Sequence, residues 1–179
     1  KLSTDEVFER VLEWAEEYNK DFAKLLSNDT EYAKKIFGIE RGNEKPRKDI
    51  AKWEDTPNYT KYFYERPTEY EFAENLSNSD MIEILEKYKE IYNHNDIADD
   101  WFPRVRDMSE ELGYAKAPKL YKKNPELFRG HVGDVSTVIR VAATGRKNTP
   151  DLYQILQVLG EEEVMKRFDI AIDKLKEEA

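Results

Sequence analysis

Three basic side chains lie around a predicted break between two helices: Arg140, Arg146 and Lys147. The apolar run before Gly145 predicts a helix that ends there, because glycine readily adopts the left-handed conformation that follows a helix end. Thr149 is a good N-cap for a second helix, and Pro150 suits its first position, where the missing N–H costs nothing. That helix start would offer backbone N–H donors beside the cations. The segment 138–160 therefore predicts a binding site for an anionic or base-bearing ligand.

The sequence shows no reaction centre beside this site. It contains no cysteine, which excludes disulfides and thiolate chemistry. Its two histidines, His94 and His131, lie far apart without soft ligands near them, so we expect no metal site. No Gly-rich phosphate loop and no nucleophile elbow is present. The sequence therefore predicts a binding module rather than a catalytic domain.

The net charge of −9 is unevenly distributed. Residues 101–150 hold ten Lys and Arg and five Asp and Glu, a net charge of +5, and the remainder carries −14. A basic stretch in an acidic protein is typical of an anion-binding region; the alternative is chance clustering on a solvated face. The side chains that we expect to contact phosphate groups are Arg104, Arg106, Lys122, Lys123, Arg129, Arg146 and Lys147.

Helical periodicity in every long segment, with few glycines and prolines, predicts an all-α fold. We expect two packed helical subdomains, residues 1–95 and 96–179. A capping box at Ser3–Glu6 predicts a first helix, and helical apolar spacing continues from it to Leu26. The further helices that we expect include one capped by Asp134 and ending at Gly145 and one spanning Glu161–Glu178.

No apolar run approaches the roughly 20 residues that cross a membrane, and no signal-peptide pattern opens the chain. We therefore expect a cytoplasmic protein. The chain opens on Lys1 and enters a helix at once, so we expect it to be a piece of a longer protein.

One set of residues recurs at the offsets of a known family: Arg140, Thr144, Gly145, Thr149, Pro150, Leu152 and Leu159–Gly160. The set resembles the C-terminal anticodon-binding region of bacterial glutamyl-tRNA synthetases, which are class I aminoacyl-tRNA synthetases. Trp14–Tyr18 and Lys45–Trp53 extend the resemblance into the first third of the chain. The cluster at 140–160 is the most specific part.

The resemblance implies a helical anticodon-binding fold and a place in an ATP-dependent glutamate–tRNA ligase. Arg140, Thr149, Pro150 and Leu152 would lie against anticodon bases, and the seven basic residues named above would contact the tRNA backbone. The implied partners are the anticodon arm of tRNA(Glu) and an upstream catalytic domain of the same polypeptide, which would hold ATP and Mg²⁺. The chain itself would be a monomer without a cofactor and inactive alone.

Two features of the family do not carry over to the sequence. The class I signatures His-Ile-Gly-His and Lys-Met-Ser-Lys-Ser are absent, and Gly130–Gly133 has its glycines and histidine in a different order. The residue that reads the first anticodon base has no recognisable counterpart here, which leaves open whether the parent enzyme also charges tRNA(Gln).

Two other interpretations remain open at this point. One is a helical protein-interaction scaffold, which explains the acidic surface better and the basic stretch worse. The other is the anticodon domain of a class I lysyl-tRNA synthetase; the spacing from Thr144 to Leu152 favours the glutamyl enzyme.

Overall fold

The computed structural model describes residues 2–41 and 52–178, and the chain forms two compact units. Unit 1 comprises Lys1–Arg66 and Pro150–Leu159, and unit 2 comprises Pro67–Thr149 and Gly160–Ala179. The chain therefore leaves unit 1 at Arg66, re-enters it for one helix, and returns to unit 2 at Gly160. The segment 45–53, which carries part of the family resemblance, lies mostly outside the described residues.

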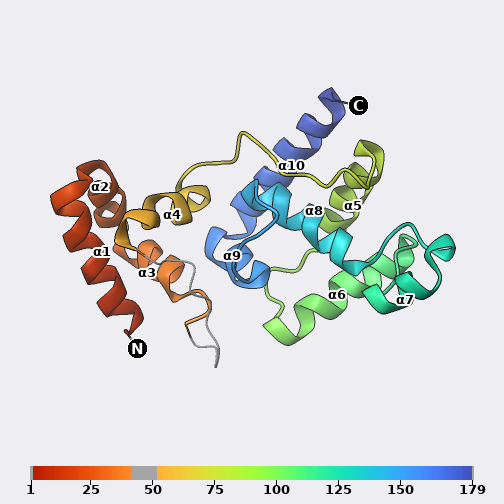
Figure 1. Cartoon of the computed structure of the whole chain (residues 1–179), viewed down its shortest axis with the longest axis horizontal. Helices are drawn as coiled ribbons and strands as arrows, with labels where there is room; N and C mark the ends of the chain where they lie inside the picture. Colours follow the sequence, from red (N-terminus) through yellow and green to blue (C-terminus); the bar gives the residue numbers. More distant parts are fainter. Residues whose placement is uncertain (1, 42–51, 179) are drawn as a thin grey trace. The chain divides into compact units, whose positions relative to one another are not determined.

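Unit 1 is built from short helices around two apolar clusters (Figure 1). Val7, Val11, Phe22 and Leu26 belong to the first cluster, each less than 5% exposed. In the second, Ile155 packs with residues in or directly after two earlier helices: Ile36, Ile39, Tyr62 and Phe63. The elements are α1 (Thr4–Tyr18), α2 (Lys20–Asn28), α3 (Thr30–Gly38), η1 (Trp53–Asp55), α4 (Thr56–Tyr64) and α9 (Leu152–Leu159).

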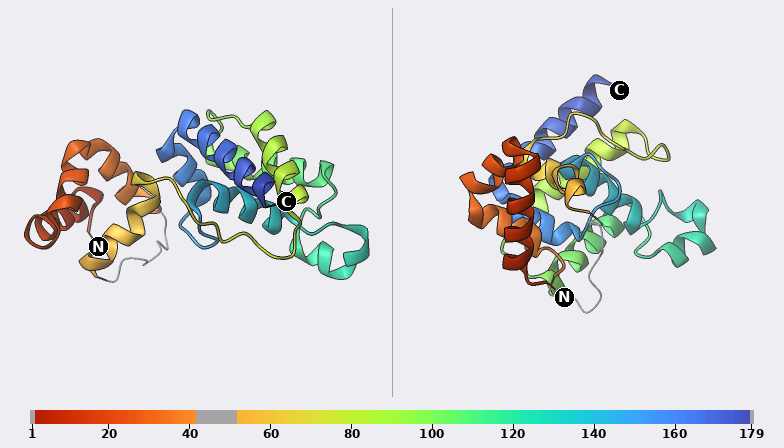
Figure 2. Two further views of the ribbon diagram at one scale, coloured as in Figure 1. Left: turned by 90° about the horizontal axis from the view of Figure 1, so that it is seen from above. Right: turned by 60° about the vertical axis from the view of Figure 1, so that its left-hand side comes forward.

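Unit 2 is a bundle in which α5, α8 and α10 pack against one another, and α6 packs on α8 (Figure 2). The Tyr88 and Phe168 rings meet edge to face in its core, with centroids 5.6 Å apart. The elements of unit 2 are α5 (Asn78–Ile91), α6 (Ala98–Glu111), α7 (Pro118–Lys123), η2 (Pro125–Leu127), α8 (Val132–Thr144) and α10 (Glu161–Glu177).

The all-α prediction is confirmed: over 2–41 and 52–178 the regular elements are helices, and the single extended contact is a bridge between Ala115 and His131. None of the described helices is long and apolar enough to cross a membrane. The capping box at the start of α1 is also confirmed, since the Glu6 N–H donates to Ser3 Oγ and the Ser3 N–H donates to Glu6 Oε2.

The first helix is shorter than predicted. It ends at Tyr18, because the side chain of Asn19 caps a new helix by accepting the Phe22 N–H at 3.1 Å. The apolar spacing is nearly in phase across this break, so the periodicity alone did not reveal it.

The two units do not coincide with the expected subdomains 1–95 and 96–179. Helix α5, expected in the first subdomain, packs on α10 and α8, so residue 95 falls inside unit 2. The Tyr88–Phe168 contact between α5 and α10 joins residues 80 positions apart in sequence.

Candidate nucleic-acid interface

Helix α8 ends where the sequence predicted, in a turn that requires glycine. Gly145 has φ 79°, in the left-handed region, and its N–H donates to the Val141 carbonyl at 2.7 Å. A Cβ at this position would lie 2.6 Å from the Glu69 carbonyl oxygen, so a side chain would clash as well as strain the backbone. The start of α8 differs in detail: His131 is the N-cap, and Asp134 completes its capping box by accepting the His131 N–H.

Arg140 contacts Thr149 across the turn that follows α8. The Arg140 Nη1 atom donates to the Thr149 carbonyl oxygen at 3.2 Å and also to the Thr149 hydroxyl. Thr149 is only 5% exposed. The structure thus brings together two of the four predicted base-reading residues and uses the arginine to hold the end of the turn. Before binding, the guanidinium is hydrogen-bonded to Thr149.

The prediction that Thr149 caps the next helix is wrong. Helix α9 begins at Leu152, and the Asp151 carboxylate caps it by accepting the Gln154 N–H at 2.9 Å. The carboxylate suits the positive end of a helix, and the Thr149 hydroxyl is already engaged by Arg140. Pro150 therefore precedes the helix instead of opening it.

The two remaining base-reading candidates, Pro150 and Leu152, belong to unit 1. Both are buried, with Leu152 2% exposed in the first turn of α9. A role for Leu152 against a base therefore stays a prediction. Because the Leu152 side chain is almost fully buried, it offers little surface to a base in this structure.

Glu71 holds the turn between Gly145 and Thr149 from outside. Its carboxylate accepts the Lys147 N–H at 3.1 Å, and its own backbone N–H donates to the Gly145 carbonyl at 2.9 Å. Within the turn, the Thr144 hydroxyl accepts the Arg146 N–H at 3.1 Å. The side chain of Lys147 is exposed, and Arg146 is half-buried. Sequence reasoning missed Glu71, which lies more than 70 residues before the turn.

Arg167 holds the last turn of α8 from inside unit 2. This arginine is 3% exposed, and its Nη1 donates to the Ala143 carbonyl at 2.8 Å. Its Nε lies 3.3 Å from the Glu163 carboxylate, one turn earlier on α10. The carbonyls of a final helical turn lack helical partners, so this contact fixes the helix end that carries Arg140. No local signal in the sequence marks Arg167 for that role.

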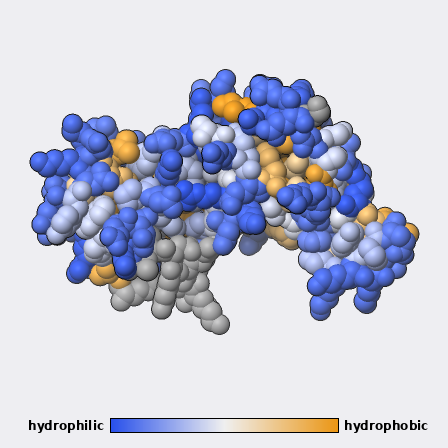
Figure 3. Space-filling model, turned by 45° about the horizontal axis from the view of Figure 1, so that its top comes forward, coloured by the Kyte–Doolittle hydropathy of each residue, from blue (hydrophilic) through white to orange (hydrophobic). Residues whose placement is uncertain are grey.

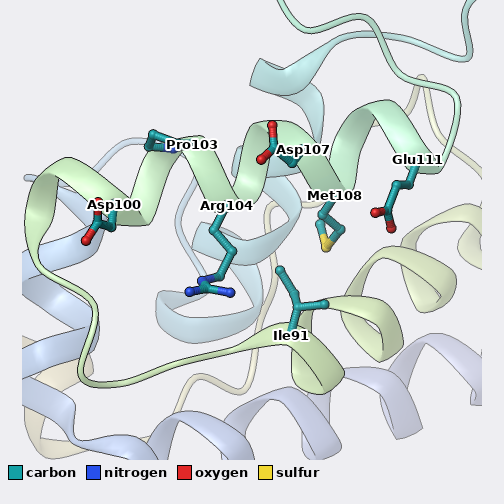
Figure 4. Close-up of a pocket in the computed structure, with 7 residues that line it drawn as sticks. All are labelled: Ile91, Asp100, Pro103, Arg104, Asp107, Met108 and Glu111. Carbon is teal, nitrogen blue, oxygen red and sulfur yellow. The ribbon is translucent and has the colours of Figure 1, made fainter.

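Arg104 and Arg106 lie in acidic surroundings on α6. Arg104 forms a bidentate pair with Asp96, with Nε–Oδ2 and Nη2–Oδ1 distances of 2.5 and 3.0 Å, and this pairing lowers the pKa of Asp96. Arg106 lies 3.9 Å from Asp107. Figure 4 shows Arg104 in a hollow of about 390 Å³ between α6 and the end of α5, whose carboxylates would repel phosphate: Asp100, Asp107 and Glu111.

Arg129 is likewise engaged within unit 2. Its guanidinium binds Glu83 at 2.6 Å, Asp80, and the carbonyl of Leu112 at 2.8 Å. It also covers the ring of Tyr114, 4.9 Å from the centroid. The two carboxylates raise the pKa of Arg129, and they neutralise its charge locally. A contact of Arg129 with phosphate stays a prediction. Its structural role is to hold Glu83, Asp80 and the Leu112 carbonyl.

The α7 lobe, residues 116–128, presents exposed cations of unit 2. Backbone hydrogen bonds from Arg129 to Gly113 and from Ala115 to Gly130 close its base. Lys122 and Lys123 are exposed, and none of the described side chains forms an ion pair with them. Figure 3 shows hydrophilic side chains projecting from this end of unit 2 at the lower right.

The expected absence of a metal site stays an expectation. In the part of the chain that the structure describes, no group of three or more His, Cys, Asp and Glu side chains is placed to hold a metal ion. His131 serves as a helix cap, with its Nδ1 accepting the Gly133 N–H at 3.0 Å.

Comparisons with known proteins match most of the chain. A family model described as "Anticodon binding domain" covers residues 6–172. The glutamate–tRNA ligase of Acetivibrio thermocellus is 41% identical over 172 residues, which is 93% of this chain and 31% of that protein. The glutamate–tRNA ligase of Clostridium perfringens (strain SM101) is 38% identical over 174 residues, 94% of this chain and 32% of that protein. That of Sorangium cellulosum is 37% identical over 171 residues, 93% and 30% respectively. The chain therefore spans about a third of the length of these curated relatives.

Proposed function

Since this chain belongs to the anticodon-binding domain family, we propose that it holds the anticodon arm of tRNA(Glu) as part of a glutamate–tRNA ligase. The single observation that carries the proposal is the Arg140–Thr149 contact, fixed at the end of α8 by Gly145. An arginine has donors in a planar fork that matches the edge of a base, and unstacked loop bases expose those edges.

Recognition divides between base reading and phosphate contacts. Arg140 and Thr149 read base edges, and exposed lysines hold the backbone without reading sequence. Lys122, Lys123 and Lys147 suit this second role best, because their side chains are exposed. Arg104 and Arg129 contribute less to it, since each is already paired with carboxylates.

The aminoacylation chemistry belongs to the rest of the ligase in this proposal. An upstream catalytic domain binds ATP and Mg²⁺ and attaches glutamate, while this chain acts as a monomeric module in the cytoplasm and has no activity alone. The relatives described above are glutamate–tRNA ligases, which favours this assignment over a lysyl-type enzyme or an interaction scaffold.

A pair of RNA ligands tests the proposal. One is a fluorescently labelled anticodon arm of tRNA(Glu), and the other is the same stem with the three anticodon bases replaced. We expect the 179-residue chain to bind the first at least about tenfold more tightly, because a good base contact contributes on the order of 1–3 kcal/mol. Equal affinity for the two arms in anisotropy titrations would contradict anticodon reading, and no binding of either arm would favour the scaffold.

Replacing both Lys122 and Lys123 by alanine should flatten the salt dependence of binding. Each phosphate contact on single-stranded RNA contributes about −0.7 to the slope of log affinity on log salt, so the slope should fall by roughly 1.4. The ratio of affinities for the two arms should stay unchanged, since phosphate contacts carry no sequence information. The measurement is a series of titrations between low and moderate salt.

Arg106→Ala is the control for this pair, because it removes a half-exposed cation beside Asp107 on a different helix of unit 2. If the slope of log affinity on log salt changes for Arg106→Ala and not for the lysine pair, the phosphate contacts lie on α6 and not on the α7 lobe.

A further inference from the structure

Glu71 presents a carboxylate to the segment that carries the proposed RNA site. Negative charge beside an RNA-binding loop repels phosphate, so electrostatics alone would disfavour a carboxylate at this place. The hydrogen bonds of Glu71 give a different reason for a carboxylate at this position. The carboxylate accepts the Lys147 N–H, and the Glu71 N–H donates to the Gly145 carbonyl. Glu71 therefore holds two residues of the turn, Gly145 and Lys147.

The segment that carries Glu71 is itself fixed in unit 2. Tyr70 and Phe72 stack on each other with centroids 5.3 Å apart and an interplanar angle of 12°. Side chains alternate in direction along non-helical chain, so the residue between the two rings is turned away from them. Both rings line a hollow of about 400 Å³ with Met81 and Leu175, and Glu71 is absent from that lining. The two rings thus lie at this hollow with Met81 and Leu175, and the Glu71 carboxylate accepts the Lys147 N–H of the turn.

Fixing the turn at Gly145 and Lys147 also fixes the position of Thr149. Only Asn148 separates Lys147 from Thr149, and the Thr149 carbonyl and hydroxyl in turn hold Arg140. The other end of the turn is held by Arg167 through the Ala143 carbonyl. The path from Glu71 to the arginine therefore runs through one short, hydrogen-bonded stretch of backbone.

We propose that Glu71 is a positioning residue for anticodon reading, which acts through the turn 145–149 on Thr149 and Arg140 without touching RNA. This inference rests on the proposed function, because it assumes that Arg140 reads a base. Its chemical content is specific: the carboxylate acts as a hydrogen-bond acceptor for a backbone N–H, and its negative charge is not required.

Three variants of the 179-residue chain test the proposal. Glu71→Ala removes the acceptor, Glu71→Gln keeps an oxygen acceptor without the charge, and Glu69→Ala removes a charge from the same segment. The Glu69 side chain lines the hollow beside Tyr70, and among the described residues its carboxylate makes no hydrogen bond or ion pair. Each variant is titrated with the cognate arm and with the arm whose anticodon is replaced, and the Lys147 amide is followed by hydrogen exchange.

We expect Glu71→Ala to reduce the cognate-to-replaced affinity ratio by about five- to tenfold, where tenfold corresponds to ~1.4 kcal/mol. Its Lys147 amide should exchange faster. Glu71→Gln and Glu69→Ala should keep the wild-type ratio and the wild-type exchange rate. Thermal unfolding is recorded in parallel, and a drop in melting temperature without a change in the ratio would mean that Glu71 has only a structural role, which overturns the proposal.

Three further results would also overturn it. If Glu71→Ala and Glu71→Gln strengthen binding of both arms alike, Glu71 acts through its charge. If the wild-type chain discriminates between the arms and Glu71→Ala does so equally well, the inference fails and the proposed function stands. If the wild-type chain binds the two arms equally well, both the inference about Glu71 and the proposed function fail.

Discussion

Replacing Arg140 by alanine is expected to weaken binding of the cognate anticodon arm by about 5- to 150-fold, the equivalent of the 1–3 kcal/mol of a good bidentate base contact. Binding of the arm with a replaced anticodon should change much less, because the contacts of Lys122 and Lys123 with phosphate survive. The measurement is the ratio of the two dissociation constants at fixed salt, since affinity alone would mix the two kinds of contact.

Thr149 supplies the companion variants for this experiment. Thr149→Ala removes the hydroxyl that Arg140 contacts and should reduce the ratio as well, while Thr149→Ser keeps the hydroxyl and should behave nearly as wild type. Asp151→Ala is the matched control: it removes the actual cap of α9, which should lower stability by ~1 kcal/mol and leave the ratio intact. If Arg140→Ala and Thr149→Ala both keep the full ratio, the pair only stabilises the turn.

Replacing Arg167 by alanine should lower the stability of unit 2 by about 3 kcal/mol. The change leaves the Ala143 carbonyl without its buried donor and removes the cation beside Glu163, whose side chain is 27% exposed. The partial exposure of Glu163 places the estimate at the lower end of the range for broken buried pairs. Because the loss falls on the end of α8, the variant tests the support of Arg140 independently of RNA.

Urea unfolding followed by Trp101 fluorescence reports on unit 2, and Trp14 and Trp53 of unit 1 are changed to Phe for this purpose. The shift of the midpoint at constant slope gives the loss of free energy. Arg167→Lys should recover only part of it, since one ammonium cannot reproduce the fork that reaches both partners. Arg106→Ala, which removes a half-exposed arginine, should stay within about 0.5 kcal/mol of wild type. A loss below 1 kcal/mol for Arg167→Ala would show that the end of α8 is secured without it.

The parts of the fold that depend on local chemistry were predictable from the sequence. The Ser3–Glu6 capping box, the left-handed Gly145 and the extent of α10 from Glu161 all follow from neighbouring residues, and the structure confirms them. The break at Asn19 was not predicted, because Ala15, Tyr18 and Phe22 keep nearly helical spacing across it and only the asparagine cap interrupts the chain.

The candidate site shows the same division. The family resemblance carried by Arg140 and Thr149 agrees with the match to the anticodon-binding domain model, and the structure places these residues in contact. The cap was assigned to Thr149 instead of Asp151, because both residue types favour the position and the sequence does not reveal that Arg140 occupies the threonine hydroxyl.

The supporting contacts lie outside what a single sequence can predict. Glu71, Arg167 and the pairing of Arg129 with Asp80 and Glu83 each join residues that are between 24 and 76 positions apart. Such contacts depend on the packing of whole helices, so a list of basic residues could not separate the engaged Arg129 from the exposed Lys122.

The position of α9 in unit 1 has a consequence for how the protein is made. A ribosome releases the N-terminal helices first and Pro150–Leu159 about 80 residues later, which takes roughly 4 to 16 s at bacterial and eukaryotic elongation speeds. Until then Ile36, Tyr62 and Phe63 lack the side chain of Ile155 and expose apolar surface of the kind that chaperones bind. Unit 1 therefore completes its second apolar cluster only after residues 67–149 of unit 2 have left the ribosome.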